Sequence, residues 1–411
     1  MRQAALSAPT LSIPTLLLIV FIDFVGIGAL IPILPYTVID ELGYSETVMT
    51  ALLASFSLAM FIGNPILGRL SDRLGRKLVL MASLAVATFA HFVFAFSNDI
   101  LILFAARIVA GLAAGNIGVI QALIADNTST ENRAKYMGFM GASIGAGFVF
   151  GPALGGLLSG VGGGPLHQAP FAIAGLFTIF AFLLCLRLPS DQASAPNQDH
   201  AVDTPAIARI WQMLSSPLGL FALAFFLLNL AFSQVEASFV LLLKDVFSYN
   251  AKQTGWLFTY VGVCIIVVQG GLIGAAVRRF GEAGTMTAGA TMLAIGQLLT
   301  ASVAAGFLLN SVMPLLLVVL CTTIVCVGFA FTNPSLSAAA SKSARAGEMG
   351  GALGLVQGFG SLGQVTGLAA AGPLYAAGGG QLSFGTGGVI CCLLVVILLF
   401  VAKVQHQSST A

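Results

Sequence analysis

The sequence predicts an all-α membrane protein with twelve transmembrane helices in two pseudo-symmetric six-helix halves. Three observations lead to this fold class. Of the 411 residues, 58% are hydrophobic, and the mean hydropathy is +0.99. Apolar runs long enough to cross a bilayer recur along the chain, and one pattern is shared by the two halves. A soluble protein cannot bury so much apolar surface, whereas a membrane protein exposes it to lipid.

The spans are read from apolar runs of about 20 residues or more, separated by polar breaks. The first six lie near 11–36, 47–70, 79–97, 100–125, 137–160 and 170–188. The second six lie near 217–243, 253–276, 285–307, 314–338, 350–376 and 383–402. The long polar stretch 189–216 is predicted to be a flexible linker, so that the halves are 1–188 and 217–411.

The basic residues predict the orientation, because Lys and Arg are retained in cytoplasmic loops. With a cytoplasmic N-terminus, the inside segments hold 14 of the 17 basic residues: Arg2, Arg69, Arg73, Arg76, Lys77, Arg133, Lys135, Arg187, Arg209, Arg278, Arg279, Lys342, Arg345 and Lys403. Lys244 and Lys252 fall outside, and Arg107 lies within a span. We therefore expect both termini and the linker to be cytoplasmic.

The shared pattern has an offset of 212 residues. Six residues of the first half then fall on identical residues of the second half: Arg133, Ala134, Met137, Gly138, Gly151 and Gly155 on Arg345, Ala346, Met349, Gly350, Gly363 and Gly367. The predicted eleventh helix therefore repeats the fifth.

Other classes of protein are disfavoured. The six cysteines lie in apolar runs and show neither metal-ligand spacing nor a disulfide framework. The sequence contains no nucleophile–base pair, metal cluster or nucleotide-binding loop, so we expect neither an enzyme nor a cofactor. The basic residues lie in loops between spans, and they give no reason to expect a nucleic-acid partner.

One polar run is exceptional, since five of its ten residues are charged: Gly68-Arg69-Leu70-Ser71-Asp72-Arg73-Leu74-Gly75-Arg76-Lys77. It is expected to form a tight turn at the membrane surface. The run resembles the loop between the second and third helices of the major facilitator superfamily, which implies a secondary transporter with a substrate cavity between its halves. The resemblance also implies a gating latch formed by Gly68, Asp72, Arg73, Gly75, Arg76 and Asp126. The alternative is a topology signal only.

The predicted fifth helix carries closely spaced small residues, at Gly147, Gly151, Pro152, Gly155 and Gly156. Glycines four apart let a neighbouring backbone approach closely, and proline removes a helix hydrogen bond. The pattern is similar to a motif of the drug:proton antiporter branch of the superfamily, where it shapes the seam between the halves. It favours export over uptake.

Three ionisable residues lie within predicted spans, where a charge costs roughly 2.5–3.5 kcal/mol on insertion scales. They are Asp23 in the first, Arg107 in the fourth and Glu236 in the seventh. One interpretation is a structural ion pair between Arg107 and an acid. The other is proton coupling, with Asp23 as the main proton carrier and Glu236 as a partner of the substrate or of Arg107.

Uncharged amides cluster on helices that line the cavity in this superfamily, or on a neighbouring helix. They are Asn116, Gln121, Asn229, Gln234, Gln269 and Asn333. Two roles stay open for them: contact with the substrate, or hydrogen bonds between helices.

The first half also resembles the tetracycline efflux pumps of Gram-negative bacteria. The resemblance covers Asp23 to Gly28, the stretch from Arg107 to Asp126, and Glu131 to Met140. Those pumps carry an acid in the third and in the ninth helix, whereas 79–97 and 285–307 contain none here. We therefore expect a related transporter with a different substrate.

The leading hypothesis is a proton-coupled exporter of a small drug-like or amphipathic molecule, working by alternating access in the bacterial inner membrane. Its partners would be that molecule, protons and the lipid bilayer, with the chain acting as a monomer. The alternative is a dedicated transporter of a metabolite such as a siderophore, a sugar or an amino-acid derivative. A non-transporting receptor is a third hypothesis, which the buried acids disfavour.

Overall fold

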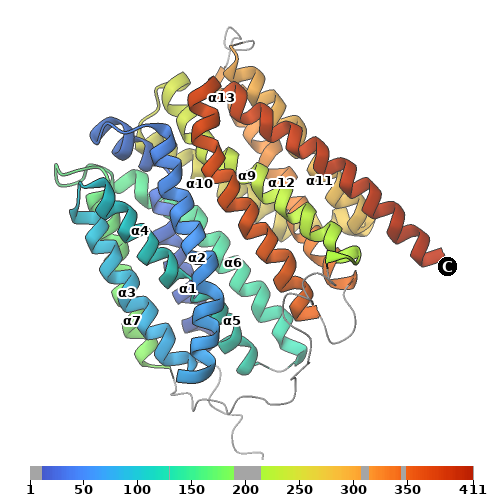
Figure 1. Ribbon diagram of the computed structural model, residues 1–411, viewed down its shortest axis with the longest axis horizontal. Coiled ribbons are helices and arrows are strands. Elements are labelled where there is room, and N and C mark those ends of the chain that lie inside the picture. Colours follow the sequence, from blue (N-terminus) through green and yellow to red (C-terminus); the bar gives the residue numbers. More distant parts are fainter. Residues whose placement is uncertain (1–11, 129, 189–213, 307–313, 344–348, 411) are drawn as a thin grey trace, which may run out of the picture. The chain divides into compact units, whose positions relative to one another are not determined.

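The computed structural model describes residues 12–128, 130–188, 214–306, 314–343 and 349–410 (Figure 1). The described residues are helical apart from short turns. The helices before the linker are α1 (Ser12–Leu30), η1 (Tyr36–Glu41), α2 (Glu46–Leu74), α3 (Arg76–Phe96), α4 (Ile100–Ala114), α5 (Ile117–Asp126), α6 (Thr130–Leu158) and α7 (Gln168–Leu186). Those after it are α9 (Pro217–Phe247), α10 (Ala251–Val267), η3 (Val268–Leu272), α11 (Ile273–Ala304), α12 (Pro314–Ser343) and α13 (Met349–Thr410). The predicted all-α class is confirmed.

Ten helical segments of the described chain are long and apolar enough to cross a membrane. The two longest, Ala251–Ala304 and Leu353–Lys403, have 54 and 51 residues, although one crossing needs only about 20. Each contains non-helical glycines, at Gly281 in the first and at Gly378 and Gly379 in the second. If each segment crosses twice, the number of spans reaches twelve, which stays a prediction.

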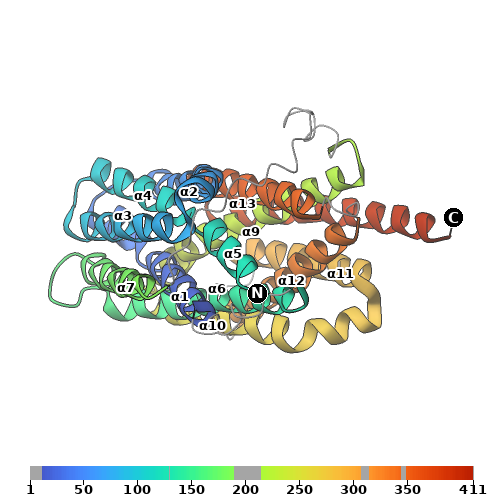
Figure 2. The ribbon, with the colours of Figure 1, turned by 90° about the horizontal axis from the view of Figure 1, so that it is seen from below.

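The chain forms two compact units. The first comprises Met1–Tyr44, Ser55–Ala201 and Tyr249–Gly262, so it includes most of α2 and the beginning of α10. Within it, α1 packs against α6 and α7, and α3 packs against α4 and α7 (Figure 2). Its core is aliphatic, with Ile19, Leu80 and Ile120 fully buried.

The second unit comprises Ser45–Ala54, Val202–Ser248 and Val263–Ala411. Within it, α9 packs against α13, and α11 packs against both α12 and α13. Phe225, Leu293 and Leu394 lie in its core. Each unit therefore has a hydrophobic core of its own.

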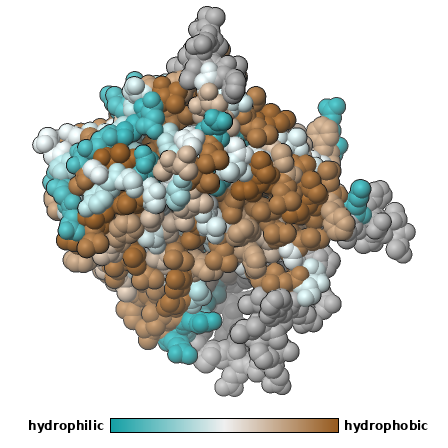
Figure 3. Space-filling view, turned by 45° about the horizontal axis from the view of Figure 1, so that its top comes forward, coloured by the Kyte–Doolittle hydropathy of each residue, from teal (hydrophilic) through white to brown (hydrophobic). Residues whose placement is uncertain are grey.

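The surface agrees with a membrane environment. Hydrophobic residues cover much of the visible face, and hydrophilic residues form smaller patches (Figure 3). Large apolar side chains such as Phe89, Leu101 and Val389 are about two-thirds exposed or more, at 68%, 74% and 65%. Exposed apolar area on this scale is unfavourable in water and favourable in lipid.

Candidate functional site

An ion-pair cluster joins α2, α3 and α5 in the first unit. The Arg76 Nε atom lies 2.6 Å from Asp126 Oδ2, and its Nη1 atom lies 3.1 Å from Asp72 Oδ1. The guanidinium group therefore bridges two carboxylates that are 50 and four residues away in the chain. Arg73 is exposed and forms no ion pair with another residue that the structure describes. Of the two arginines assigned to the predicted latch, Arg76 alone pairs with Asp126 among the described residues.

The expected ten-residue turn is shorter than predicted. Helix α2 continues through Gly68 to Leu74, and α3 begins at Arg76, so Gly75 alone separates them. Gly75 has φ 94°, a conformation that glycine adopts without steric cost. The helix can carry the charges of Arg69, Asp72 and Arg73 because these side chains are exposed and no charge is buried there. The described partner of the Asp72 carboxylate is Arg76.

Lys77 fixes the start of α3 to the end of α7. Its ammonium group donates hydrogen bonds to the carbonyl oxygens of Leu186 and Leu188, at 2.9 and 2.5 Å. Such carbonyls have no partner within their own helix, and a cation there also interacts favourably with the helix dipole. The charged run thus joins four helix ends: those of α2, α5 and α7 and the start of α3.

The glycines of the predicted fifth helix face two neighbours. Gly147, Gly151 and Gly155 on α6 lie against the backbone of α1, where an added Cβ at 151 would be 2.7 Å from the Val25 carbonyl oxygen. Gly156 faces α10 instead, with Gly255 Cα at 3.1 Å from its added Cβ. Pro152 lies within α6, which continues to Leu158.

The repeat of 212 residues has a structural counterpart in the second unit. Gly363 and Gly367 on α13 lie against the backbone of α9, at Phe226 and Leu230. In each half, therefore, the same two glycine positions let a later helix approach the first helix closely. The shared pattern reflects close packing of backbones.

Asp23 lies on α1 and is only partly buried. Its Oδ2 atom accepts a hydrogen bond of 3.2 Å from the side-chain amide of Asn116. The same amide nitrogen lies 3.2 Å from the Ser83 hydroxyl oxygen on α3. Sequence reasoning offered Asn116 as a substrate contact or as a bond between helices. In the structure it bonds to the predicted proton carrier.

Arg107 is buried on α4, with 3% of its surface exposed. Its guanidinium carbon lies 4.0 Å from the centroid of the Phe56 ring on α2, a cation–π contact. The Nε atom has no hydrogen-bond partner among the described residues. On α3, the His91 ring nitrogen Nδ1 lies 3.3 Å from the Thr178 hydroxyl oxygen.

The polar candidates of the second unit have varied surroundings. Glu236 on α9 is half-buried, and within its own unit it makes no hydrogen bond or ion pair with a described residue. The Asn229 amide donates to the Phe225 carbonyl of its own helix at 2.9 Å. Gln234 is 3% exposed, and its Oε1 atom lacks a described partner. Asn333 on α12 is half-buried.

Two of the amides are exposed: Gln121 on α5 and Gln269 in η3. The six amides therefore do not share one environment. Asn116 and Gln234 are buried among helices, and Asn229 is bound to its own backbone. These contacts leave the predicted substrate role untested.

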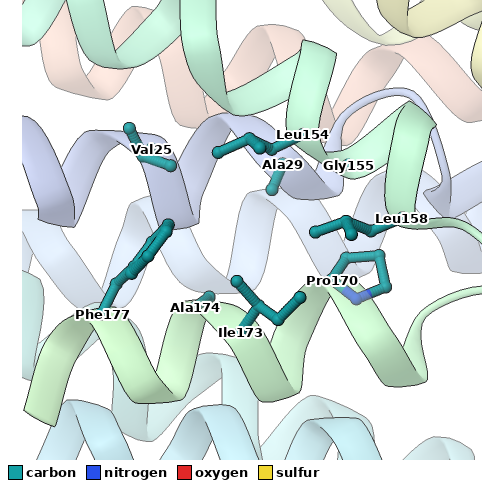
Figure 4. Close-up of a pocket in the computed structure, with 9 residues that line it drawn as sticks. All are labelled: Val25, Ala29, Leu154, Gly155, Leu158, Pro170, Ile173, Ala174 and Phe177. Atoms are coloured by element: carbon teal, nitrogen blue, oxygen red, sulfur yellow. The ribbon is translucent and has the colours of Figure 1, made fainter.

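A small apolar pocket lies between α1, α6 and α7 (Figure 4). Its space of about 210 Å³ is partly open to the exterior. The lining residues are all apolar: Val25, Ala29, Leu154, Gly155, Leu158, Pro170, Ile173, Ala174 and Phe177. No side chain there can bind a charge or donate a hydrogen bond, so the pocket offers no recognition group for a polar ligand.

Sequence reasoning missed a polar cluster at the opposite ends of α3 and α7 from Lys77. His167 Nε2 lies 3.1 Å from the Ser97 carbonyl oxygen, and Nδ1 lies 3.9 Å from Glu41 Oε2. Glu41 also accepts a hydrogen bond of 3.0 Å from the Leu166 N–H. Burial lowers the pKa of His167, although the Ser97 carbonyl and Glu41 oppose this shift. No spacing in the sequence indicates the cluster, since its members lie in three separate turns.

Comparisons with known proteins agree with this architecture. The family model described as Major Facilitator Superfamily matches residues 16–350. The class C tetracycline resistance protein of Escherichia coli is 33% identical over 302 residues, which are 72% of this chain and 75% of that protein. Multidrug resistance protein 1 of Bacillus subtilis (strain 168) is 31% identical over 369 residues, 89% of this chain and 90% of that protein.

The fold is also that of solved transporters. The crystal structure of the nucleoside transporter NupG matches with a TM-score of 0.76, covering 96% of this chain and 99% of that one. The two sequences are 15% identical, so this likeness concerns the fold alone.

Proposed function

Because the chain belongs to the major facilitator superfamily of transporters, we propose that it is a proton-coupled exporter of small amphipathic organic molecules. The observation that carries the proposal is the similarity to resistance proteins over most of the chain. The relative named for multidrug resistance aligns with 89% of the chain, and the tetracycline resistance proteins of classes C and D align with 72% and 87%.

We infer that Asp23 binds and releases the coupling proton. It is a carboxyl group within a membrane-spanning helix, and its one described hydrogen bond comes from an uncharged amide. No described cation forms an ion pair with it that would hold it ionised. One proton moving inward at 100 mV supplies about 2.3 kcal/mol, which is enough to concentrate a molecule roughly fiftyfold.

We infer that the Arg76 cluster stabilises one of two conformations of the transporter. Its two ion pairs join α2, α3 and α5. These helices can move apart only if the ion pairs break. A contact made in only one conformation raises the population of that conformation. This gives the cluster a gating role in alternating access, with the termini and the linker on the cytoplasmic side.

Glu236 is proposed to attract cationic substrates. It is half-buried on α9 and has no described partner within its own unit, so a positively charged group would improve its environment. The lack of acids in 79–97 and 285–307 separates this chain from the tetracycline pumps that its first half resembles. We therefore expect a preference for apolar or cationic compounds over tetracycline.

The test is expression in a bacterial host that lacks its own drug pumps. We expect raised tolerance to ethidium and tetraphenylphosphonium, little change for tetracycline, and loss of the effect when a protonophore collapses the proton gradient. Asp23→Asn at equal expression is the matched control and should behave as the empty vector does.

Two outcomes would contradict parts of this proposal. Strong tetracycline resistance would overturn the substrate preference. A flat profile across a broad panel of drugs would favour the dedicated metabolite transporter instead.

A further inference from the structure

Asn116 occupies a break in the middle of a membrane span. Helix α4 ends at Ala114 and α5 begins at Ile117, although the two lie in one continuous apolar segment, Ile100–Asp126. At the break, the backbone N–H groups of Gly115 and Asn116 bond to the carbonyls three residues earlier, at 3.3 and 3.1 Å. This tighter turn differs from the α-helical pattern of four residues and is often found at functional positions.

Close packing against α2 fixes the break in place. A Cβ atom at position 115 would lie 3.0 Å from the Cα atom of Asn64 and closer still to the backbone of Gly63. Only glycine fits at position 115, and the turn therefore packs directly against the backbone of α2. The neighbouring Asn116 side chain is consequently directed toward α1 and α3, and 2% of its surface is exposed.

The hydrogen bonds around Asn116 have a defined direction. The Ser83 hydroxyl donates to the Leu80 carbonyl at 2.8 Å, so it must act as the acceptor toward the Asn116 amide at 3.2 Å. The same amide nitrogen donates to Asp23 Oδ2, also at 3.2 Å. Ser83 thus holds the amide in the orientation that presents an N–H to the carboxyl group.

The amide also offers an acceptor. Asn116 Oδ1 is buried and has no hydrogen-bond partner among the described residues. An ionised carboxylate needs a donor, whereas a protonated carboxyl group needs an acceptor for its O–H. Because Ser83 holds the amide with its N–H group, and not Oδ1, toward Asp23, Asn116 stabilises the ionised carboxylate more than the protonated acid.

Other ionisable groups around α1 do not form hydrogen bonds or ion pairs with Asp23 among the described residues. On α3 and α4, His91 bonds to Thr178 and Arg107 stacks on Phe56. The charged residues of α6 lie at its start, within 131–135, and those of α5 are confined to its end at Asp126. Helix α7 contributes only the thiol of Cys185.

We propose that Asn116 is a positioning residue that sets the proton affinity of Asp23, and that it does not bind the substrate. This inference rests on the proposed function, in which Asp23 carries the coupling proton. Removing the amide takes away a hydrogen bond to the ionised carboxylate. The Asp23 carboxyl group should then take up its proton at higher pH, by about one pH unit, which is a roughly tenfold change in proton affinity.

The test is an infrared titration of the purified full-length protein. The carboxylic acid band of Asp23 is identified by its disappearance in Asp23→Asn. We expect the midpoint of this band to move up by about one pH unit in Asn116→Ala, and by less in the same direction in Ser83→Ala. Asn98→Ala removes an exposed amide in the turn before α4 and should leave the midpoint unchanged. Asn116→Ser keeps a donor and should recover part of the shift.

Ethidium binding separates positioning from substrate contact. The Kd of ethidium, measured by fluorescence, should be unchanged in Asn116→Ala if the residue only positions Asp23. An unchanged midpoint with a raised Kd would overturn the inference. If Asn116→Ala does not fold, Ser83→Ala provides the test instead. An unchanged midpoint of the Asp23 band in Ser83→Ala would then overturn the inference.

Failure of the proposed function has a different signature. The Asp23 midpoint would then shift in Asn116→Ala, but ethidium export from cells would not depend on the proton gradient. The positioning role would stand in that case, while proton coupling would fall.

Discussion

Gly151→Ala should destabilise the first unit, because the added methyl group has no room. Its Cβ would lie 2.7 Å from the Val25 carbonyl oxygen and 2.9 Å from Gly28 Cα. Both are backbone atoms of α1, so no side-chain rotation relieves the contact and the helix itself must shift. Overpacking of this kind costs about 1–3 kcal/mol.

The control is Gly138→Ala on the same helix, where an added Cβ has nothing within 4 Å. Alanine favours helix over glycine by about 1 kcal/mol in either position. This gain cancels when the two variants are compared, and the difference between them isolates the contact with α1. At about 2–4 °C for each kcal/mol, Gly151→Ala should melt several degrees below Gly138→Ala.

The assay is the melting temperature of the purified protein in detergent, followed by the loss of its monodisperse chromatographic peak after heating. The second unit offers a replicate, since Gly363 contacts α9 and Gly354 has nothing within 4 Å. Gly363→Ala should therefore melt below Gly354→Ala. If Gly151→Ala and Gly138→Ala melt within about 1 °C of each other, α1 and α6 are not packed through this glycine.

Three further predictions concern gating, topology and pH. Arg76→Ala should abolish transport while leaving membrane insertion intact, since it removes both ion pairs of the cluster. Arg69→Ala, which removes an exposed charge of the same run near the end of α2, should transport normally, and normal transport by both variants would reduce the run to a topology signal. A cysteine at Ser194, which lies outside the described residues, should be protected from a membrane-impermeant thiol reagent in intact cells, and labelling from outside would reverse the predicted orientation. Burial lowers the pKa of His167, so the unfolded chain takes up a proton before the folded one does, and stability should fall as pH drops below about 6.5. Between pH 7.5 and 5.5 the melting temperature of His167→Gln should fall less than that of the unmodified protein. An equal fall in both proteins would contradict the assignment to His167.

Local patterns predicted the parts of the structure that depend on the backbone alone. The apolar runs identified the helices, because a span must satisfy its own hydrogen bonds whatever its neighbours are. The offset of 212 residues identified equivalent glycines, and both pairs pack against the first helix of their half. The Arg76–Asp126 pair was also anticipated, through the likeness of the charged run to a known family.

Features that depend on tertiary contacts could not be predicted from the sequence. The sequence placed Asn116 and Gln121 together on one predicted helix, but the break at Gly115 separates their environments: the first bonds to Asp23 and the second is exposed. The His167 cluster joins three turns that are far apart in the chain. One of the two interpretations paired Arg107 with an acid, whereas its described contact within the first unit is the ring of Phe56. Nothing in the sequence around Phe56 indicates that contact.

The most direct test of proton-coupled export through Asp23 is ethidium transport in proteoliposomes with an imposed pH gradient. The unmodified protein should move ethidium against its concentration gradient while protons flow the other way. Asp23→Asn should bind ethidium but show no response to the pH gradient, and Glu236→Gln should remain coupled with weaker ethidium binding. Coupling that survives in Asp23→Asn but is lost in Glu236→Gln would reverse the two roles, and coupling that survives in both would contradict proton transfer through these carboxyl groups.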